Sequence, residues 1–187
     1  MKSLYFYFFI VGFCFSSVSF ADDLLNGCHF YQDYNPDFHK VVSYDNEGLK
    51  LYREHKIKEA EAHLLTVFWA KNAEPGDYTN EGQVKDHLLT NGPAVVACEK
   101  KHLALPTKEQ FEALRNCFES DARDSDFLSE NGRAQLVSRI PDMANQWFWT
   151  ASVGKHYPGG AFAFWFQWGV FENDIRATRD SVRCVWR

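Results

Sequence analysis

The sequence lacks an excess of positive charge. Its 20 lysines and arginines are outnumbered by 25 aspartates and glutamates, which gives a net charge of −5. A nucleic-acid binder needs a positive surface that faces the phosphates, so this balance excludes a typical member of that class. The same balance argues against polyanionic partners in general, sulfated polysaccharides among them.

The sequence also lacks the short motifs of zinc sites and of serine hydrolases. It contains no C-x-x-C pair, and no G-x-S-x-G elbow frames a serine. A catalytic triad would have to draw on Ser152, His156 and either Asp142 or Asp174, and only their arrangement in space would establish it. We therefore predict a protein that is not an enzyme and that has no cofactor.

Long hydrophobic runs are missing except at the start of the chain. After Lys2, residues 4–15 are apolar apart from Gly12, and a serine-rich stretch then leads to Ala21. This order is typical of a signal peptide, residues 1–21, that is cleaved after Ala21. The alternative is a membrane anchor, but the run is shorter than the roughly 20 residues that a spanning helix needs. We expect a soluble mature protein, periplasmic or secreted, with no stable membrane span.

The mature chain keeps an even number of cysteines in an oxidising compartment. They are Cys28, Cys98, Cys117 and Cys184. Two disulfides are the expected arrangement, and a zinc site is the alternative. Four cysteines allow three pairings, and the spacing does not choose among them.

The N-terminal segment, residues 22–92, is expected to combine an irregular arm with a long helix. Residues 22–44 are rich in Asp, Asn and aromatic side chains, which favours an arm without regular structure. Apolar residues then recur at helical intervals over residues 45–72, which predicts an amphipathic helix with a break near His55. Proline and glycine in residues 73–82 indicate a loop.

Three side chains on this helix have a spacing that can suit a metal ion, namely His55, Glu59 and His63. The two histidines would lie two helical turns apart, about 12 Å, too far to share one ion. We therefore predict a solvated helix face here and no metal site.

Helices followed by antiparallel strands are expected in the second half of the chain. Residues 93–101 predict a helix that begins at a proline, and residues 103–105 predict a short strand. Thr107 and Gln110 fit a capping box for the next helix. One apolar stripe of that helix faces a core, formed by Phe111, Leu114 and Phe118.

Aromatic and β-branched residues dominate the last part of the chain. Residues 147–153, 161–171 and 181–187 predict strands, and the second is apolar on both faces, as in a central strand. The polar residues 121–131 and 173–180 predict loops. This order of elements predicts an α+β fold.

Three segments in this half resemble a known family. "ACEKKHLALPTKEQFEAL", "WFWTAS" and "AFAFWFQWG" with "VRCVWR" are similar to the signatures of the Lcl C-terminal-domain family of exported bacterial proteins. The resemblance covers residues 93–187 and implies a C-type-lectin-like domain over that range. Ala104 departs from the family pattern, in which arginine precedes Leu-Pro-Thr.

The resemblance also implies a disulfide pairing. In such folds a cysteine of an early helix pairs with one of the final strand, which corresponds to Cys98 and Cys184. Cys28 and Cys117 then form the second pair, which ties the arm to the helix at Thr107. The chain is thus expected to be an α+β protein, stapled by disulfides, with a helical segment before a C-type-lectin-like half.

Aromatic side chains are the most distinctive candidates for a binding surface. Most of them should form core, but exposed aromatics beside a glycine turn make a platform for a sugar ring or a protein. The candidate residues for ligand or partner binding are Trp149, His156, Tyr157, Trp165 and Gln167.

An acidic stretch gives an alternative based on calcium. Glu172, Asn173 and Asp174 resemble the ligands that some C-type lectins use for calcium and sugar, but calcium needs six to eight oxygens. We therefore favour a polar loop without metal at this position.

The function predicted from the sequence is non-enzymatic recognition of a protein or glycan in the bacterial envelope or outside the cell. The alternatives are a periplasmic immunity protein that blocks a toxin, or a hydrolase of cell-wall or other glycans. Residues 103–120 are interpreted as scaffold, so the site is sought in the aromatic strands after Asn145.

Overall fold

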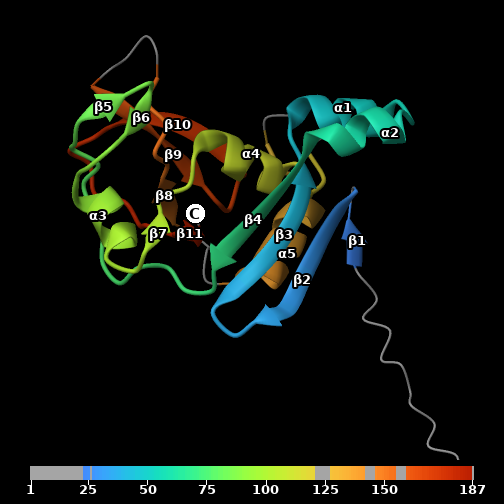
Figure 1. Cartoon of the computed structure of the whole chain (residues 1–187), viewed down its shortest axis with the longest axis horizontal. Coiled ribbons are helices and arrows are strands. Elements are labelled where there is room, and N and C mark those ends of the chain that lie inside the picture. Colours follow the sequence, from blue (N-terminus) through green and yellow to red (C-terminus); the bar gives the residue numbers. More distant parts are fainter. Residues whose placement is uncertain (1–22, 26, 121–126, 142–145, 155–158, 187) are drawn as a thin grey trace, which may run out of the picture.

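The computed structural model describes residues 23–25, 27–120, 127–141, 146–154 and 159–186. The segment expected to be a signal peptide, residues 1–21, lies outside these residues, as do His156, Tyr157 and Asp142. The described chain combines helices with sheets whose strands pair antiparallel, which confirms the α+β class (Figure 1). None of the described helices has the length and apolar character needed to cross a membrane.

The larger sheet has six strands in the order β1-β2-β3-β4-β11-β7. They are β1 (Asp23–Leu25), β2 (Cys28–Asn35), β3 (Phe38–Tyr44), β4 (Leu64–Ala70), β7 (Leu103–Ala104) and β11 (Val185–Trp186). The irregular arm expected over residues 22–44 is therefore wrong. Its Asn, Pro and Asp residues form a tight turn between β2 and β3, in which Asn35 Oδ1 accepts from the Asp37 N–H at 2.7 Å.

The helix expected over residues 45–72 is correct only in its first part. α1 (Asn46–Arg53) is capped by Asp45, and the chain then breaks at His55, which has a φ of 59°. α2 (Ile57–Ala60) and the 3₁₀ turn η1 (Glu61–His63) follow. Leu64–Ala70 is strand β4 instead of helix, because its apolar residues pair along the whole length of β3.

The next elements follow the sequence expectation closely. α3 (Pro93–Glu99) begins at its proline, and α4 (Lys108–Arg115) begins with the expected capping box. A small hairpin, β5 (Val84–Lys85) with β6 (Leu88–Leu89), precedes them. The sequence does not predict α5 (Glu130–Arg139), and the loop expected over residues 121–131 is wrong where it overlaps the first turn of this helix.

The smaller sheet has the order β10-β9-β8. It contains β8 (Trp147–Trp149), β9 (Gly160–Trp165) and β10 (Val170–Ile175), so β9 is central as expected. The single strand expected over residues 161–171 is wrong, because the chain turns at residues 166–169. Gly169 permits this turn with a φ of 69°, and a Cβ there would lie 2.5 Å from Leu128 Cγ.

Helix α4 packs between the two sheets. The ring of Phe111 lies 4.8 Å from that of Trp69 on β4 and 4.9 Å from that of Phe164 on β9. All three side chains are fully buried, as are Leu114 and Phe118. The apolar face of α4 therefore belongs to the core, which leaves its opposite face for other contacts.

Two disulfides link the helices to the strands of the larger sheet. Cys28 of β2 is bonded to Cys117 just after α4, and Cys98 of α3 is bonded to Cys184 next to β11. This is the pairing that the family resemblance implies. The larger sheet takes strands from both sides of the boundary expected at residue 92, and that boundary stays a prediction.

Candidate functional site

The structure separates the aromatic candidates by exposure. Trp149 is fully buried, and its indole N–H donates to the Tyr78 carbonyl at 2.7 Å. It is a core residue, so its assignment to a binding surface is corrected. Trp165 and Gln167 are partly exposed, whereas His156 and Tyr157 lie outside the described residues.

Trp165 belongs to a cluster of three tryptophans, in which it stacks on Trp147 and meets Trp168 edge to face. Its ring lies 5.1 Å from that of Trp147, its cross-strand neighbour on β8, and 6.0 Å from that of Trp168. The guanidinium of Arg133 lies 4.4 Å from the centroid of Trp168. These contacts hold Trp165 and Trp168 in fixed orientations while part of each remains accessible.

Both tryptophans line a cavity between α4 and the β9–β10 hairpin, which we call the aromatic hollow. It has a volume of about 820 Å³, within the range of pockets that hold small ligands. Its lining is formed by Asn46, Lys108, Glu112, Arg115, Phe127, Phe162, Trp165, Trp168, Val170, Phe171 and Glu172. The hollow therefore combines accessible aromatic rings with charged side chains of both signs.

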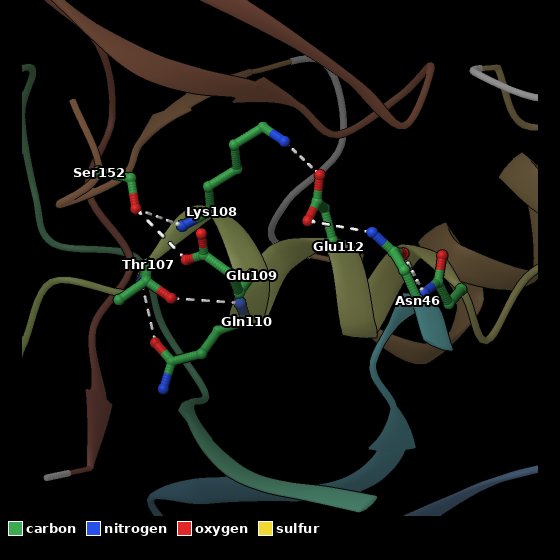
Figure 2. Close-up of polar contacts among 8 residues, drawn as sticks. Asn46, Thr107, Lys108, Glu109, Gln110, Glu112 and Ser152 are labelled. Atoms are coloured by element: carbon green, nitrogen blue, oxygen red, sulfur yellow. Dashed lines mark hydrogen bonds and ion pairs between the residues drawn. The ribbon is translucent and has the colours of Figure 1, made fainter. Parts of the chain in front are cut away.

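The polar wall of the aromatic hollow is built on α4 (Figure 2). Glu112 accepts from the ammonium of Lys108 and from the side-chain amide of Asn46 on α1. Asn116 donates to Asn46 Oδ1 at 2.8 Å and holds that amide in place. The polar groups of this wall are thus ordered by one another before any ligand arrives.

Lys108 also contacts the aromatic side of the hollow. Its ammonium lies 4.9 Å from the centroid of Phe171 and 5.3 Å from that of Phe162. The lysine therefore connects helix α4 to strands β9 and β10 and helps to fix the width of the hollow.

Sequence reasoning missed the part that α4 plays. The clear apolar stripe of residues 103–120 favours a purely structural role for this segment. Lys108, Glu112 and Arg115 are spaced i, i+4 and i+7, which places them together on the opposite face. That spacing was a usable signal, but the strands that complete the hollow lie far away in the sequence.

The structure gives Ser152 a structural role. It is buried, and its Oγ accepts from the N–H of Lys108 at 3.0 Å and lies 3.5 Å from Glu109 Oε2 (Figure 2). These contacts help to hold the first turn of α4. Of the other candidates for the hypothetical triad, His156 and Asp142 lie outside the described residues, and Asp174 lies on β10.

The metal candidates can be placed individually. His55 sits in the break after α1, whereas His63 Nδ1 is 3.0 Å from Asp45 Oδ2. Asp174 Oδ1 accepts from Thr178 and from the N–H of Ile175. Within the part of the chain that the structure describes, no three His, Cys, Asp or Glu side chains form a group able to hold a metal ion.

A buried carboxyl lies in another region of the molecule. Asp180 is only 8% exposed, and its backbone pairs with Tyr78. Burial, together with the nearby charges of Asp174 and Asp77, raises the pKa of Asp180 to about 6. This side chain affects the stability of the fold and does not line the aromatic hollow.

Comparisons with family models, with characterised proteins and with solved structures find no match to this chain. The candidate site therefore has to be interpreted from its own residues.

Proposed function

We propose that the protein is an exported recognition protein that binds its partner, without chemical conversion, in the aromatic hollow. The observation that carries the proposal is the pair Trp165 and Trp168, which are partly exposed yet held by contacts between aromatic rings in one concave site. Accessible tryptophans in a preformed hollow are the usual anchors of a binding site.

Two features support export and the lectin-like assignment. Disulfides persist in oxidising compartments, and the structure contains two of them. The proposal therefore keeps the cleaved signal peptide over residues 1–21 and a location in the periplasm or outside the cell. It also keeps the C-type-lectin-like character of residues 93–187, which rests on the resemblance of the three sequence motifs.

The contacts of the polar wall favour binding over catalysis. Glu112 is bonded to both Lys108 and Asn46, and Lys108 also lies against two phenylalanine rings. Groups that satisfy one another in this way orient a bound molecule by hydrogen bonds at their free edges.

The test is retention of the mature protein on immobilised envelope material of the producing cell. We expect Trp165→Ala and Trp168→Ala each to weaken retention about tenfold or more, because truncated aromatic anchors lose most of their contact area. Trp186→Ala is the matched control, since Trp186 is 60% exposed on β11 and does not line the hollow.

Thermal unfolding is measured for the same variants. The proposal requires a tryptophan variant that loses retention and keeps a melting temperature within about 4 °C of the wild type. Unchanged retention in both hollow variants would refute it, as would equal loss in Trp186→Ala.

A further inference from the structure

A second cavity adjoins the aromatic hollow, and we call it the basic hollow. It has a volume of about 450 Å³. Its lining is formed by Asn46, Leu49, Lys50, Arg53, Glu54, Arg115, Asn116 and Ser120. Asn46 and Arg115 line both cavities, so the two hollows adjoin at these side chains, and we call the two together the composite groove.

The charge of the basic hollow is opposite to that of the whole chain. It gathers Lys50, Arg53 and Arg115 in a protein with a net charge of −5. Its one carboxylate, that of Glu54, is bonded to Lys56 at 2.6 Å. The net charge of the chain, which argued against anionic partners, therefore does not describe this surface.

The two arginines of the basic hollow are available for a ligand. Among the described residues, neither Arg53 nor Arg115 has a carboxylate within ion-pair distance, and Lys50 has only a loose contact of 3.9 Å with exposed Glu47. Arg115 is partly buried and lies 6.0 Å from the centroid of Phe171. It thus stands at the junction of the aromatic and basic hollows.

Interaction with helix dipoles explains each cation only in part. Lys50 and Arg53 lie in the last turn of α1, and Arg115 lies in the last turn of α4, where positive side chains are favourable. The favourable interaction with the helix dipole would be the same wherever on the surface the two helices ended. In this structure both helices end at one cavity, and the cations of both line it beside an aromatic site.

We propose that the composite groove binds an acidic oligosaccharide. A sugar ring packs its C–H face on the aromatic rings and directs its hydroxyl groups to Asn46 and Glu112, while a carboxylate, phosphate or sulfate group binds Arg115 and Arg53. An arginine fork suits such planar or tetrahedral oxyanions. This assignment rests on the proposed function and names the chemical class of its ligand.

The experiment measures binding of the mature protein to a panel of acidic oligosaccharides and their neutral parents. The acidic probes are sialyllactose, oligogalacturonate and a heparin-derived oligosaccharide, and the neutral probes include lactose and oligogalactose. A short polyglutamate peptide serves as an acidic probe that has no sugar ring. Affinities are taken from isothermal titration calorimetry at low and at physiological salt.

We expect at least one acidic oligosaccharide to bind about tenfold or more tightly than its neutral parent, with affinity that falls as salt is added. Arg115→Gln and Arg53→Gln should each weaken that binding about tenfold, because a charge-assisted hydrogen bond is lost. Arg179→Gln is the matched control, since Arg179 is exposed and lines neither hollow.

The outcomes separate this inference from the proposed function. Equal binding of acidic and neutral sugars, reduced by Trp165→Ala but not by Arg115→Gln, would overturn the anionic assignment and leave the recognition function standing. Binding of polyglutamate in preference to every acidic sugar would overturn the glycan assignment. Binding of no probe on the panel would overturn the inference as a whole, while retention on envelope material tests the proposed function independently.

Discussion

At the scale of single residues, ionisable groups in this protein differ sharply in how their charge is compensated. Glu74 is buried, and its carboxylate meets the ammonium of Lys101 at 2.9 Å. Asp180 is equally buried, but its Oδ2 finds no hydrogen-bond partner among the described residues. Ionisation of Asp180 therefore costs free energy, because it places a charge in a buried position where this oxygen has no partner.

This difference predicts a pH-dependent stability. The pKa of Asp180 is about 6 in the folded protein and about 4 in the unfolded chain, so the fold prefers the protonated form. Its stabilising contribution is complete below about pH 4 and is lost as the pH rises through about 6. Asp180→Asn, which cannot ionise, should therefore raise the free energy of unfolding by about 2 kcal/mol at about pH 8 and by less than about 1 kcal/mol at about pH 4.5.

Urea unfolding of both proteins at the two pH values provides the measurement. Asp37→Asn is the control, because Asp37 is exposed in the β2–β3 turn. The same difference between variant and wild type at both pH values would contradict the assignment of the effect to Asp180.

At the scale of helices and strands, the sequence predicts an element best where neighbouring residues determine it. The capping box of α4 involves only residues 107–110, so a short motif predicts it, and the structure contains both of its hydrogen bonds. The break near His55 is local in the same way. In contrast, the local apolar pattern of β4 predicts a helix. Its pairing with β3, which lies some twenty residues earlier in the chain, makes it a strand instead.

The same contrast explains what was missed at the site. Phe111 and Leu114 predict the buried face of α4 from their spacing alone. The exposed face of α4 becomes part of a hollow only because β9 and β10 fold against it, some fifty residues later in the chain. Helix α5 lacks a clear apolar stripe, since Leu136 and Gly132 are its only residues that pack fully inside.

The cap of α4 can be tested by substitution. Thr107 Oγ1 accepts from the N–H of Gln110 at 3.3 Å, and Gln110 Oε1 accepts from the N–H of Thr107 at 2.9 Å. Thr107→Ala removes the first bond and should lower the free energy of unfolding by about 1 kcal/mol, measured by urea titration.

An exposed threonine provides the comparison. Thr178 donates to Asp174 at 3.1 Å on the surface, so Thr178→Ala should cost only a few tenths of a kcal/mol. If Thr107→Ala were as mild as Thr178→Ala, the capping box would not stabilise the helix that bears Lys108, Glu112 and Arg115.

At the scale of the whole molecule, the two ends of the chain are joined in one sheet. β11, the last strand, lies between β4 and β7, and the N-terminal strands β2 and β3 extend the same sheet beyond β4. Such pairings between remote segments leave no local pattern, so neither the sheet order nor the role of residues 22–44 could be derived from the sequence. The disulfide pairing could be predicted only from the resemblance of three sequence segments to a known family, because spacing alone permits three pairings.

The two disulfides should contribute similarly to the stability of the fold. They span 89 and 86 residues, and the entropy of closing a loop depends only on the logarithm of its length. Replacing either pair by alanine, Cys28 with Cys117 or Cys98 with Cys184, should therefore lower the free energy of unfolding by similar amounts, about 2–5 kcal/mol. All four cysteines are buried, so alanine adds no polar group to the core.

Chemical denaturation of the two double variants, followed by tryptophan fluorescence, measures both costs against the oxidised wild type. Similar costs mean that the N-terminal hairpin and the C-terminal strand unfold together with α4 as one cooperative unit. A negligible cost for the Cys28–Cys117 pair beside a large cost for the other would contradict this. The hairpin would then be an appendage, and the hollows beside α4 would form without it.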